Sequence, residues 1–407
     1  MVASPHGSSA EYPGVPAGIS DVRESKVLEA IDYRETLEML RGLIAHPSDN
    51  PPGNEGECAG FLASFLTERG IATSLVEAAP DRPNLYASIG GSGPTLVFCG
   101  HLDTVPAGDG WTVDPFLGAV ANGRVYGRGA CDMKAGLAAM VAAMLAVKRS
   151  GVSIEGTVAL HAVIDEEFAC AGGRKAASEQ PGDWAVVGEP SSNQVFSIGN
   201  GQACYQIVFH GKAVHSSHPE QGRNAINDAA AFIVRIEEEA LRLAESPFPG
   251  IGPGTYSIGV VQGGRGGSTV PDRCEVTIDR RVLPCESLDS IDEELQRILE
   301  RLAAERPGLE WELSRPIAFP SLSGTNSGPL EQALTSAVRD LGLPIPDERQ
   351  GMRFATDAAW YEAAGCPAVV FGPGDVPIAH QPDEYVAIED LNAATRALAL
   401  CCIRLLS

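Results

Sequence analysis

Residues 95–104, TLVFCGHLDT, begin as a short apolar strand and end in a histidine and an aspartate. A run of about five apolar residues is typical of a strand that is buried on both faces of a sheet. Three further short apolar runs lie at 157–164, 184–187 and 368–371. Segments with helical periodicity separate these runs. This alternation predicts a mostly parallel sheet covered by helices, and therefore an α/β fold.

Helical periodicity outside these strands predicts helices at about 33–44, 55–69, 135–148, 329–341 and 388–406. In the first of them, Leu37, Leu40 and Leu43 fall on one face, which is the spacing of an amphipathic helix. Residues 1 to about 25 are rich in Ser, Pro and Gly and show no periodicity. We expect them to form a loose leader.

The pattern changes near residue 200. Residues 203–210, 256–262 and 274–282 alternate like half-exposed antiparallel strands, and 311–314 is a short fourth one. Helical segments lie at about 224–243 and 288–304. The order strand–helix–strand–strand–helix–strand is that of a ferredoxin-like unit. We therefore predict one α/β domain, formed by residues 1–199 and 317–407, that is interrupted by an α+β insert at 200–316.

Composition excludes several classes of protein. The 407-residue chain carries 53 acidic and 30 basic residues, a formal net charge of −23. Such a chain repels nucleic acid and anionic membranes. The longest apolar run, 135–147, is shorter than the roughly 20 residues that span a bilayer. The N-terminus lacks the features of a secretory signal, and the ten scattered cysteines suggest buried reduced thiols. We expect a cytoplasmic protein.

Polar side chains with metal-binding chemistry recur just after the predicted strands. His101 and Asp103 follow the first, the acidic run 165–167 follows the second, and Glu189 and His380 follow the third and fourth. Asp132 precedes a predicted helix. Each position has an ordinary alternative when taken alone: a surface turn for His101, a helix N-cap for Asp132, and a solvated acidic turn for 165–167.

Together we expect all five of these ligands to follow strand ends of one sheet, because ligands gather at the carboxyl ends of strands in open α/β sheets. Such a set fits two divalent cations bridged by one carboxylate. One ion would take His101 and Glu189, the other would take Glu167 and His380, and Asp132 would lie between them. Zinc suits this mixture of imidazole and carboxylate best. The absence of cysteine from the set indicates a catalytic site and not a closed structural one.

Five blocks of this sequence resemble, in order, the signature blocks of the co-catalytic zinc amidohydrolases and peptidases of family M20. The blocks are HLDT, GRGACDMKAG, DEEF, VVGEPS and AHQPDEY. That family includes acetylornithine deacetylase, succinyl-diaminopimelate desuccinylase, aminoacylase and a glutamate carboxypeptidase. The stretches GPGDVPIAHQPDEYV and VPDRCEVTIDRRVLP are most similar to those of acetylornithine deacetylases.

The resemblance implies a role for each matching residue. Asp103 would orient His101, and Glu166 would be the general base that takes a proton from a metal-bridging water and delivers it to the leaving amine. The peptide bond after Asp132 would be cis. The metal ions would be zinc, with cobalt or manganese able to substitute. The implied metal ligands are His101, Asp132, Glu167, Glu189 and His380.

In the insert, which would be a lid and dimerisation domain, the resemblance assigns two further residues. His215 would reach the active site of the partner subunit of a homodimer and stabilise the oxyanion; the alternative is a histidine on the lid surface. Arg281 would bind the substrate carboxylate; the alternatives are an exposed strand charge, or Arg280 as the true contact. Ser268 stands where many relatives have asparagine.

A last segment, MRFATDAAW, lies where relatives line the substrate pocket and contributes Arg353, Thr356 and Asp357. Asp357 is either a partner for a cationic substrate side chain or a structural turn residue. We therefore expect a metal-dependent enzyme that hydrolyses the amide bond of a small N-acyl amino acid, as acetylornithine deacetylase does. A dipeptidase, carboxypeptidase or desuccinylase of the same family is the alternative, followed by a non-catalytic dimeric binding protein.

Overall fold

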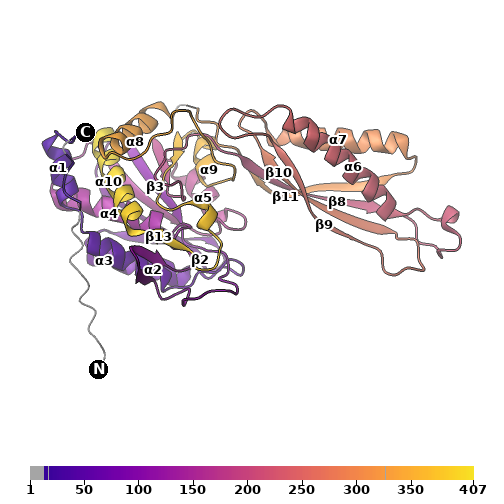
Figure 1. Ribbon diagram of the computed structural model, residues 1–407, viewed down its shortest axis with the longest axis horizontal. Helices are drawn as coiled ribbons and strands as arrows, with labels where there is room; N and C mark the ends of the chain where they lie inside the picture. The colour runs from indigo at the N-terminus through magenta and orange to yellow at the C-terminus, as the bar shows by residue number, and fades with distance from the viewer. Residues whose placement is uncertain (1–12, 17, 326) are drawn as a thin grey trace, which may run out of the picture.

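The computed structural model describes residues 13–16, 18–325 and 327–407, and it contains two units built on separate sheets (Figure 1). A six-stranded sheet lies in the larger unit, and a four-stranded sheet with two helices forms the other end of the elongated molecule. The chain passes from the larger unit into the smaller one and back again. The predicted α/β fold with an inserted α+β unit is confirmed.

The six-stranded sheet has the order β1-β2-β6-β3-β7-β12. Strands β6, β3, β7 and β12 are parallel neighbours, whereas β1 and β2 pair in antiparallel fashion at one edge. The bounds in chain order are β1 (Thr73–Ala79), β2 (Arg82–Gly90), β3 (Thr95–His101), β6 (Thr157–Val163), β7 (Trp184–Val187) and β12 (Ala368–Val370).

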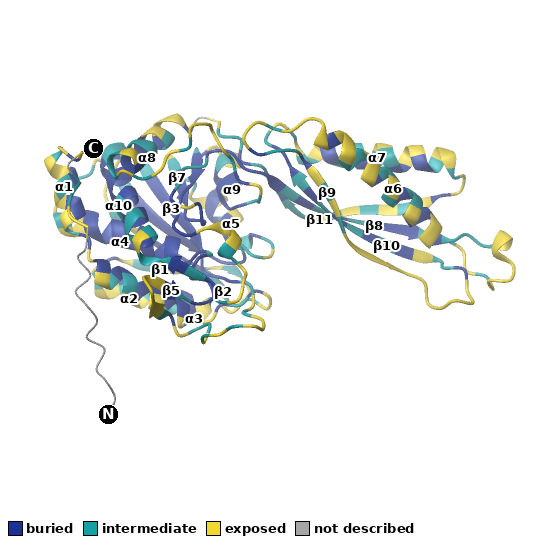
Figure 2. Ribbon diagram, viewed as in Figure 1, coloured by how far each residue is buried: buried dark blue, intermediate teal, exposed yellow. Residues whose placement is uncertain are grey.

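Helices cover both faces of this sheet, which explains why its parallel strands read as continuous apolar runs. Leu96 and Phe98 of β3 belong to one hydrophobic cluster, and Val97 and Cys99 belong to another. Figure 2 shows these central strands as buried. The first cluster packs against α1 (Val22–Glu29), α2 (Tyr33–Ile44), α3 (Gly56–Glu68), α4 (Lys134–Ser150), α8 (Gly328–Asp340) and α10 (Ile388–Leu405); the second packs against α5 (Ala171–Glu179) and α9 (Ala358–Ala363).

The smaller unit has the order β11-β8-β10-β9, with every pair antiparallel. Its chain order is β8 (Gly201–His210), α6 (Ala225–Ala244), β9 (Thr255–Gly263), β10 (Arg273–Val282), α7 (Leu288–Glu305) and β11 (Glu310–Phe319). This is the ferredoxin-like topology that the sequence predicts. We call this unit the lid. A third, small sheet joins β4 (Ala119–Ala121), β5 (Arg124–Tyr126) and β13 (Tyr385–Ala387).

The structure differs from the sequence prediction in several places, and it also contains β4, β5, β13, α5 and α9, which the sequence did not predict. Helix α1 begins at Val22, inside the stretch predicted to lack structure, and the rest of the predicted leader lies partly outside the described residues, at 1–12 and 17. Strands β1 and β2 are also not predicted; β1 is half-exposed and carries no apolar run. Strand β11 continues to Phe319, since an irregularity between Ser314 and Ile317 lets the ladder pass Pro316.

All ten cysteines are free, and all but Cys204 and Cys285 are buried, as the prediction of reduced thiols requires. Each helix of the described residues is too short or too polar to span a bilayer.

Candidate active site

Four of the five predicted metal ligands follow strands of the six-stranded sheet, at the carboxyl edge of its parallel part. His101 is the last residue of β3, Glu167 lies just beyond β6, and Glu189 lies just beyond β7. His380 follows β12 after a loop that contains the short helix η2 (Val376–Ile378). Parallel strands present their carboxyl ends at one edge, so these four side chains converge.

Asp132 reaches the same place by another route, which corrects the expectation that all five ligands follow strands of one sheet. It lies in the turn after β5 of the small sheet. It is also not a helix N-cap, because Met133 occupies that position of α4. Its peptide bond to Met133 is cis, as the family resemblance implies.

The ligand atoms form two groups that share Asp132. His101, Asp132 and Glu189 form one group, and Asp132, Glu167 and His380 form the other, with the atoms of each group within 4.8 Å of one another. One oxygen of Asp132 lies 3.2 Å from Nε2 of His101, and the other lies 3.3 Å from Nε2 of His380. Asp132 thus faces both groups at once, which is the placement of a bridging carboxylate.

The charges of the site are poorly balanced by the protein alone. Burial raises the pKa of Glu189 to about 8, and its Oε1 is buried without a hydrogen-bond partner. Hydrogen bonds to Asp132 and Glu167 raise the pKa of His380 to about 10. Crowded carboxylates of this kind are stabilised by cations. The donor set of two imidazoles and three carboxylates therefore fits a pair of divalent ions.

Glu166 lies beside these groups and lines the same cavity as Glu167 and Glu189. Burial, followed by the negative charge of Glu189, raises the pKa of Glu166 well above its usual range. A buried carboxyl group with a raised pKa is suited to accepting and returning a proton.

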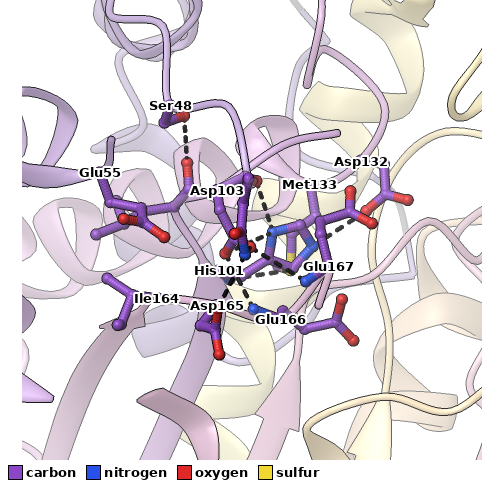
Figure 3. Close-up of polar contacts among 12 residues, drawn as sticks. Ser48, Glu55, His101, Asp103, Asp132, Met133, Ile164, Asp165, Glu166 and Glu167 are labelled. Atoms are coloured by element: carbon purple, nitrogen blue, oxygen red, sulfur yellow. Dashed lines mark hydrogen bonds and ion pairs between the residues drawn. The ribbon is translucent and has the colours of Figure 1, made fainter. Parts of the chain in front are cut away.

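Asp103 contacts both the ring of His101 and the turn that carries Glu166 and Glu167 (Figure 3). Its backbone oxygen lies 2.8 Å from Nδ1 of His101, while its carboxylate lies 3.7 Å from the same nitrogen. The carboxylate also accepts hydrogen bonds from the backbone N–H groups of Glu166 and Glu167, both at 3.1 Å. Asp103 therefore connects the turn after β6 to the His101 ring.

Two residues that support the ligand-bearing turns, Asn50 and Glu384, were not predicted from the sequence. The Asn50 amide donates to Asp103 at 2.9 Å and to Asp165 at 3.0 Å, which joins the turns after β3 and β6. The carboxylate of Glu384 pairs with Arg128 and accepts the backbone N–H groups of Cys131 and Asp132. Glu384 lies within the AHQPDEY block, so the family resemblance could have indicated that it belongs to the site. Nothing in the sequence indicated that Asn50 approaches this turn.

A cavity of about 330 Å³ lies against the two ligand groups. Arg281 lines it, whereas Arg280 is fully buried in the lid, where it pairs with Glu286 and lies over the Tyr256 ring at 4.8 Å. The cavity is lined by Asp132, Glu166, Glu167, Glu189, Pro190, Gln202, Arg281, Phe319, Phe354, Ala355, Val376, Ala379 and His380.

The other predicted site residues do not line this cavity. His215 and Ser268 lie together in the lid, since His215 bridges to Thr269 and Ser216 bonds to the Ser268 carbonyl. Arg353 is exposed and donates to the carbonyl of Ile251 at 2.9 Å.

Thr356 and Asp357 are buried behind the cavity wall that Phe354 and Ala355 form. Asp357 lies close against Gly173. Burial raises the pKa of Asp357 to about 7.

Comparison with known proteins gives consistent results. Residues 97–404 match the sequence model of peptidase family M20/M25/M40. An acetylornithine deacetylase of Myxococcus xanthus is 31% identical over 84% of this chain and 88% of its own length. An N-formyl-4-amino-5-aminomethyl-2-methylpyrimidine deformylase of Bacillus subtilis is 28% identical over 89% of this chain and 93% of its own. A solved structure, a Bacillus subtilis dinuclear metal-binding peptidase, has a TM-score of 0.72 at 20% identity and covers 92% of this chain and 98% of its own.

Proposed function

This chain belongs to peptidase family M20/M25/M40 and is a metal-dependent amidohydrolase, and from that premise we propose that it hydrolyses the amide bond of a small N-acyl amino acid. The observation that carries the proposal is the double ligand group sharing Asp132, with Glu166 at its side. The similarity to acetylornithine deacetylases supports an N-acyl amino acid over a longer peptide. A dipeptidase, carboxypeptidase or desuccinylase activity is the alternative.

Each residue of the site has a defined part in this proposal. His101, Asp132, Glu167, Glu189 and His380 would hold two divalent cations, zinc by the chemistry of the ligands, with cobalt or manganese as substitutes. Such ions supply Lewis acidity to the substrate carbonyl and lower the pKa of water. Glu166 takes a proton from the attacking water and delivers it to the leaving nitrogen. Asp103 fixes the ring of His101 and the turn that carries Glu166.

The cavity supports the assignment of Arg281 to the substrate carboxylate. Arg281 belongs to β10 of the lid and lines the same cavity as Glu167, Glu189 and His380. Planar, bidentate binding of a carboxylate is the interaction for which arginine is best suited. In this proposal the scissile amide lies between the lid and the edge of the six-stranded sheet. Arg353, Thr356 and Asp357 would then act behind or beside the cavity wall, and not on the substrate directly.

We also propose a homodimer formed through the lid, in which His215 of one subunit serves the active site of the other. His215 is exposed, and its ring lies 2.7 Å from the Ser217 hydroxyl. It does not line the cavity of its own subunit, so a role in catalysis requires a second copy. An isolated β-bridge pairs His215 with Thr269, the residue after Ser268. Ser268 would therefore reach the same active site of the partner subunit. The domain division at 199/200 and 316/317 is part of this proposal, with strand β11 of the lid running three residues past the second boundary, to Phe319. We also propose a cytoplasmic location.

The test is a panel of substrates assayed with one metal-reconstituted sample. Release of free amino acid from N-acetyl amino acids, with no cleavage of dipeptides, supports the proposal. Cleavage of dipeptides or of N-succinyl-diaminopimelate alone supports the alternative. Glu166→Gln serves as the control for contaminating hydrolases, because it removes the proposed general base and keeps the shape of the side chain.

A further inference from the structure

The lid side of the cavity is a row of three side chains on neighbouring strands. Gln202 of β8 pairs directly with Arg281 of β10 on one side and with Phe319 of β11 on the other. Residues directly opposite one another in a sheet share a face. The row therefore runs from a guanidinium through an amide to an aromatic ring, across about 10 Å, or two strand spacings.

The positive charge of Arg281, at one end of this row, is balanced by Asp279 of the lid. Nε of Arg281 donates to one oxygen of Asp279 at 2.9 Å, and the Gln202 amide donates to the other oxygen at 2.5 Å. Both oxygens of Asp279 are thus engaged. The two terminal nitrogens of Arg281 have no hydrogen-bond partner among the described residues, so they are free to hold a substrate carboxylate in bidentate fashion.

The other end of the row is apolar. Phe319 is 5% exposed and packs against Trp360 at 6.2 Å between ring centroids. Phe354 lines the cavity from the catalytic domain, together with Pro190 and Val376. All four carboxylates among the lining residues belong to the ligand groups or to Glu166. Among the described residues that line the cavity, no carboxylate is left to pair with an ammonium group.

We propose that the amino-acid side chain of the substrate is uncharged and apolar, and that Phe319 and Phe354 select it. The inference rests on the proposed function. With the amide at the ligand groups and the carboxylate on Arg281, the side chain leaves the α-carbon next to the row and meets its apolar end. A neutral side chain gains free energy by burial there, whereas an ammonium loses its water without a counter-charge.

Two N-acetyl amino acids of equal shape provide the sharpest test. The norleucine side chain has the shape of the ornithine side chain but ends in a methyl group and not an ammonium. We expect kcat/KM for N-acetylnorleucine to exceed that for N-acetylornithine by about tenfold or more, which is the order of discrimination that an apolar pocket achieves. N-acetylphenylalanine should also be accepted. Equal or faster hydrolysis of N-acetylornithine overturns this inference but leaves the proposed function standing. Hydrolysis of none of them overturns both.

A pair of variants locates the selectivity. Phe354→Glu places a carboxylate in the apolar wall, whereas Phe354→Gln removes the same ring without adding charge. We expect Phe354→Glu to raise the ratio of kcat/KM for N-acetylornithine over N-acetylnorleucine by about tenfold relative to Phe354→Gln. An unchanged ratio in two folded variants shows that Phe354 does not face the substrate side chain and contradicts its assignment. The comparison of substrates in the parent enzyme stands whether or not the variants fold.

Discussion

Replacing Glu384 by Gln should uncouple the loop that carries Asp132 from the rest of the site. Glu384 is fully buried, and its Oε2 lies 2.5 Å from Nη1 of Arg128, which is 2% exposed. Its Oε1 accepts the backbone N–H groups of Cys131 at 2.8 Å and Asp132 at 3.0 Å. Every one of these partners is a donor. A glutamine amide must therefore turn its own N–H2 group toward at least one of them.

The expected loss of stability follows from the burial of the Arg128–Glu384 ion pair. Removing one partner of a buried ion pair costs about 3–5 kcal/mol, because the other charge is left without compensation. That is a large part of the total stability of about 5–15 kcal/mol typical of a protein domain. Residues that orient metal ligands also affect metal affinity, typically by 10- to 100-fold. Glu384→Gln should therefore lower both the free energy of unfolding and the affinity for divalent ions.

Denaturant unfolding in the presence of a chelator measures the first effect, and metal titration of the folded variant measures the second. Glu179→Gln is the matched control, since Glu179 pairs with Lys175 on an exposed helix face. Such a pair is worth at most about 1 kcal/mol. The reasoning is refuted if Glu384→Gln unfolds within about 0.5 kcal/mol of the parent protein and binds metal with the same affinity.

Three other predictions concern the general base, the supporting turn and a buried histidine. Glu166→Gln should lower kcat by about 10²–10⁴ without loss of bound metal, as measured by kinetics and metal analysis of one sample; unchanged kcat would exclude it as the base. Asn50→Ala removes one donor from two buried carboxylates, so it should cost at least about 1.5 kcal/mol in chemical denaturation, and a cost near zero would contradict the contacts. Burial lowers the pKa of His161 from 6.5 to about 4, so the unfolded chain binds this proton more readily than the folded protein does. Stability from His161 is then present above pH 6.5 and lost as the pH falls toward 4, by about 3 kcal/mol. His161→Gln should lack that part of the pH dependence, and equal pH profiles for the two proteins would contradict the assignment.

The sequence predicted those parts of the fold that follow from one dominant pattern. Strands such as β7 and helices such as α2 were predicted within a residue or two, because buried runs and amphipathic spacing are local signals. Strand β1 was missed, since its residues are half-exposed and gain their strand conformation from pairing with β2. Tertiary pairing of this kind leaves little trace in composition.

In the candidate site, too, some features could be predicted from the sequence and others depend on tertiary contacts. His101 and Glu189 follow the neighbouring strands β3 and β7, so their grouping agrees with the strand order. Glu167 and His380 follow β6 and β12, which are not neighbours, and the loops after these strands bring the two side chains together. The path of Asp132 could not be predicted, because it depends on the small sheet and on Glu384, which lies far away along the chain. Asn50 contributes through contacts with residues more than fifty positions away, and no spacing rule reveals such contacts.

The central claim is that five residues hold a pair of divalent ions that the amide hydrolysis requires. The most direct test measures bound metal and hydrolysis of an N-acetyl amino acid panel on the same metal-reconstituted protein. We predict about two ions per chain and hydrolysis that a chelator abolishes and added metal restores. A chain that binds no divalent ion, or that hydrolyses the panel equally well after chelation, would contradict the claim.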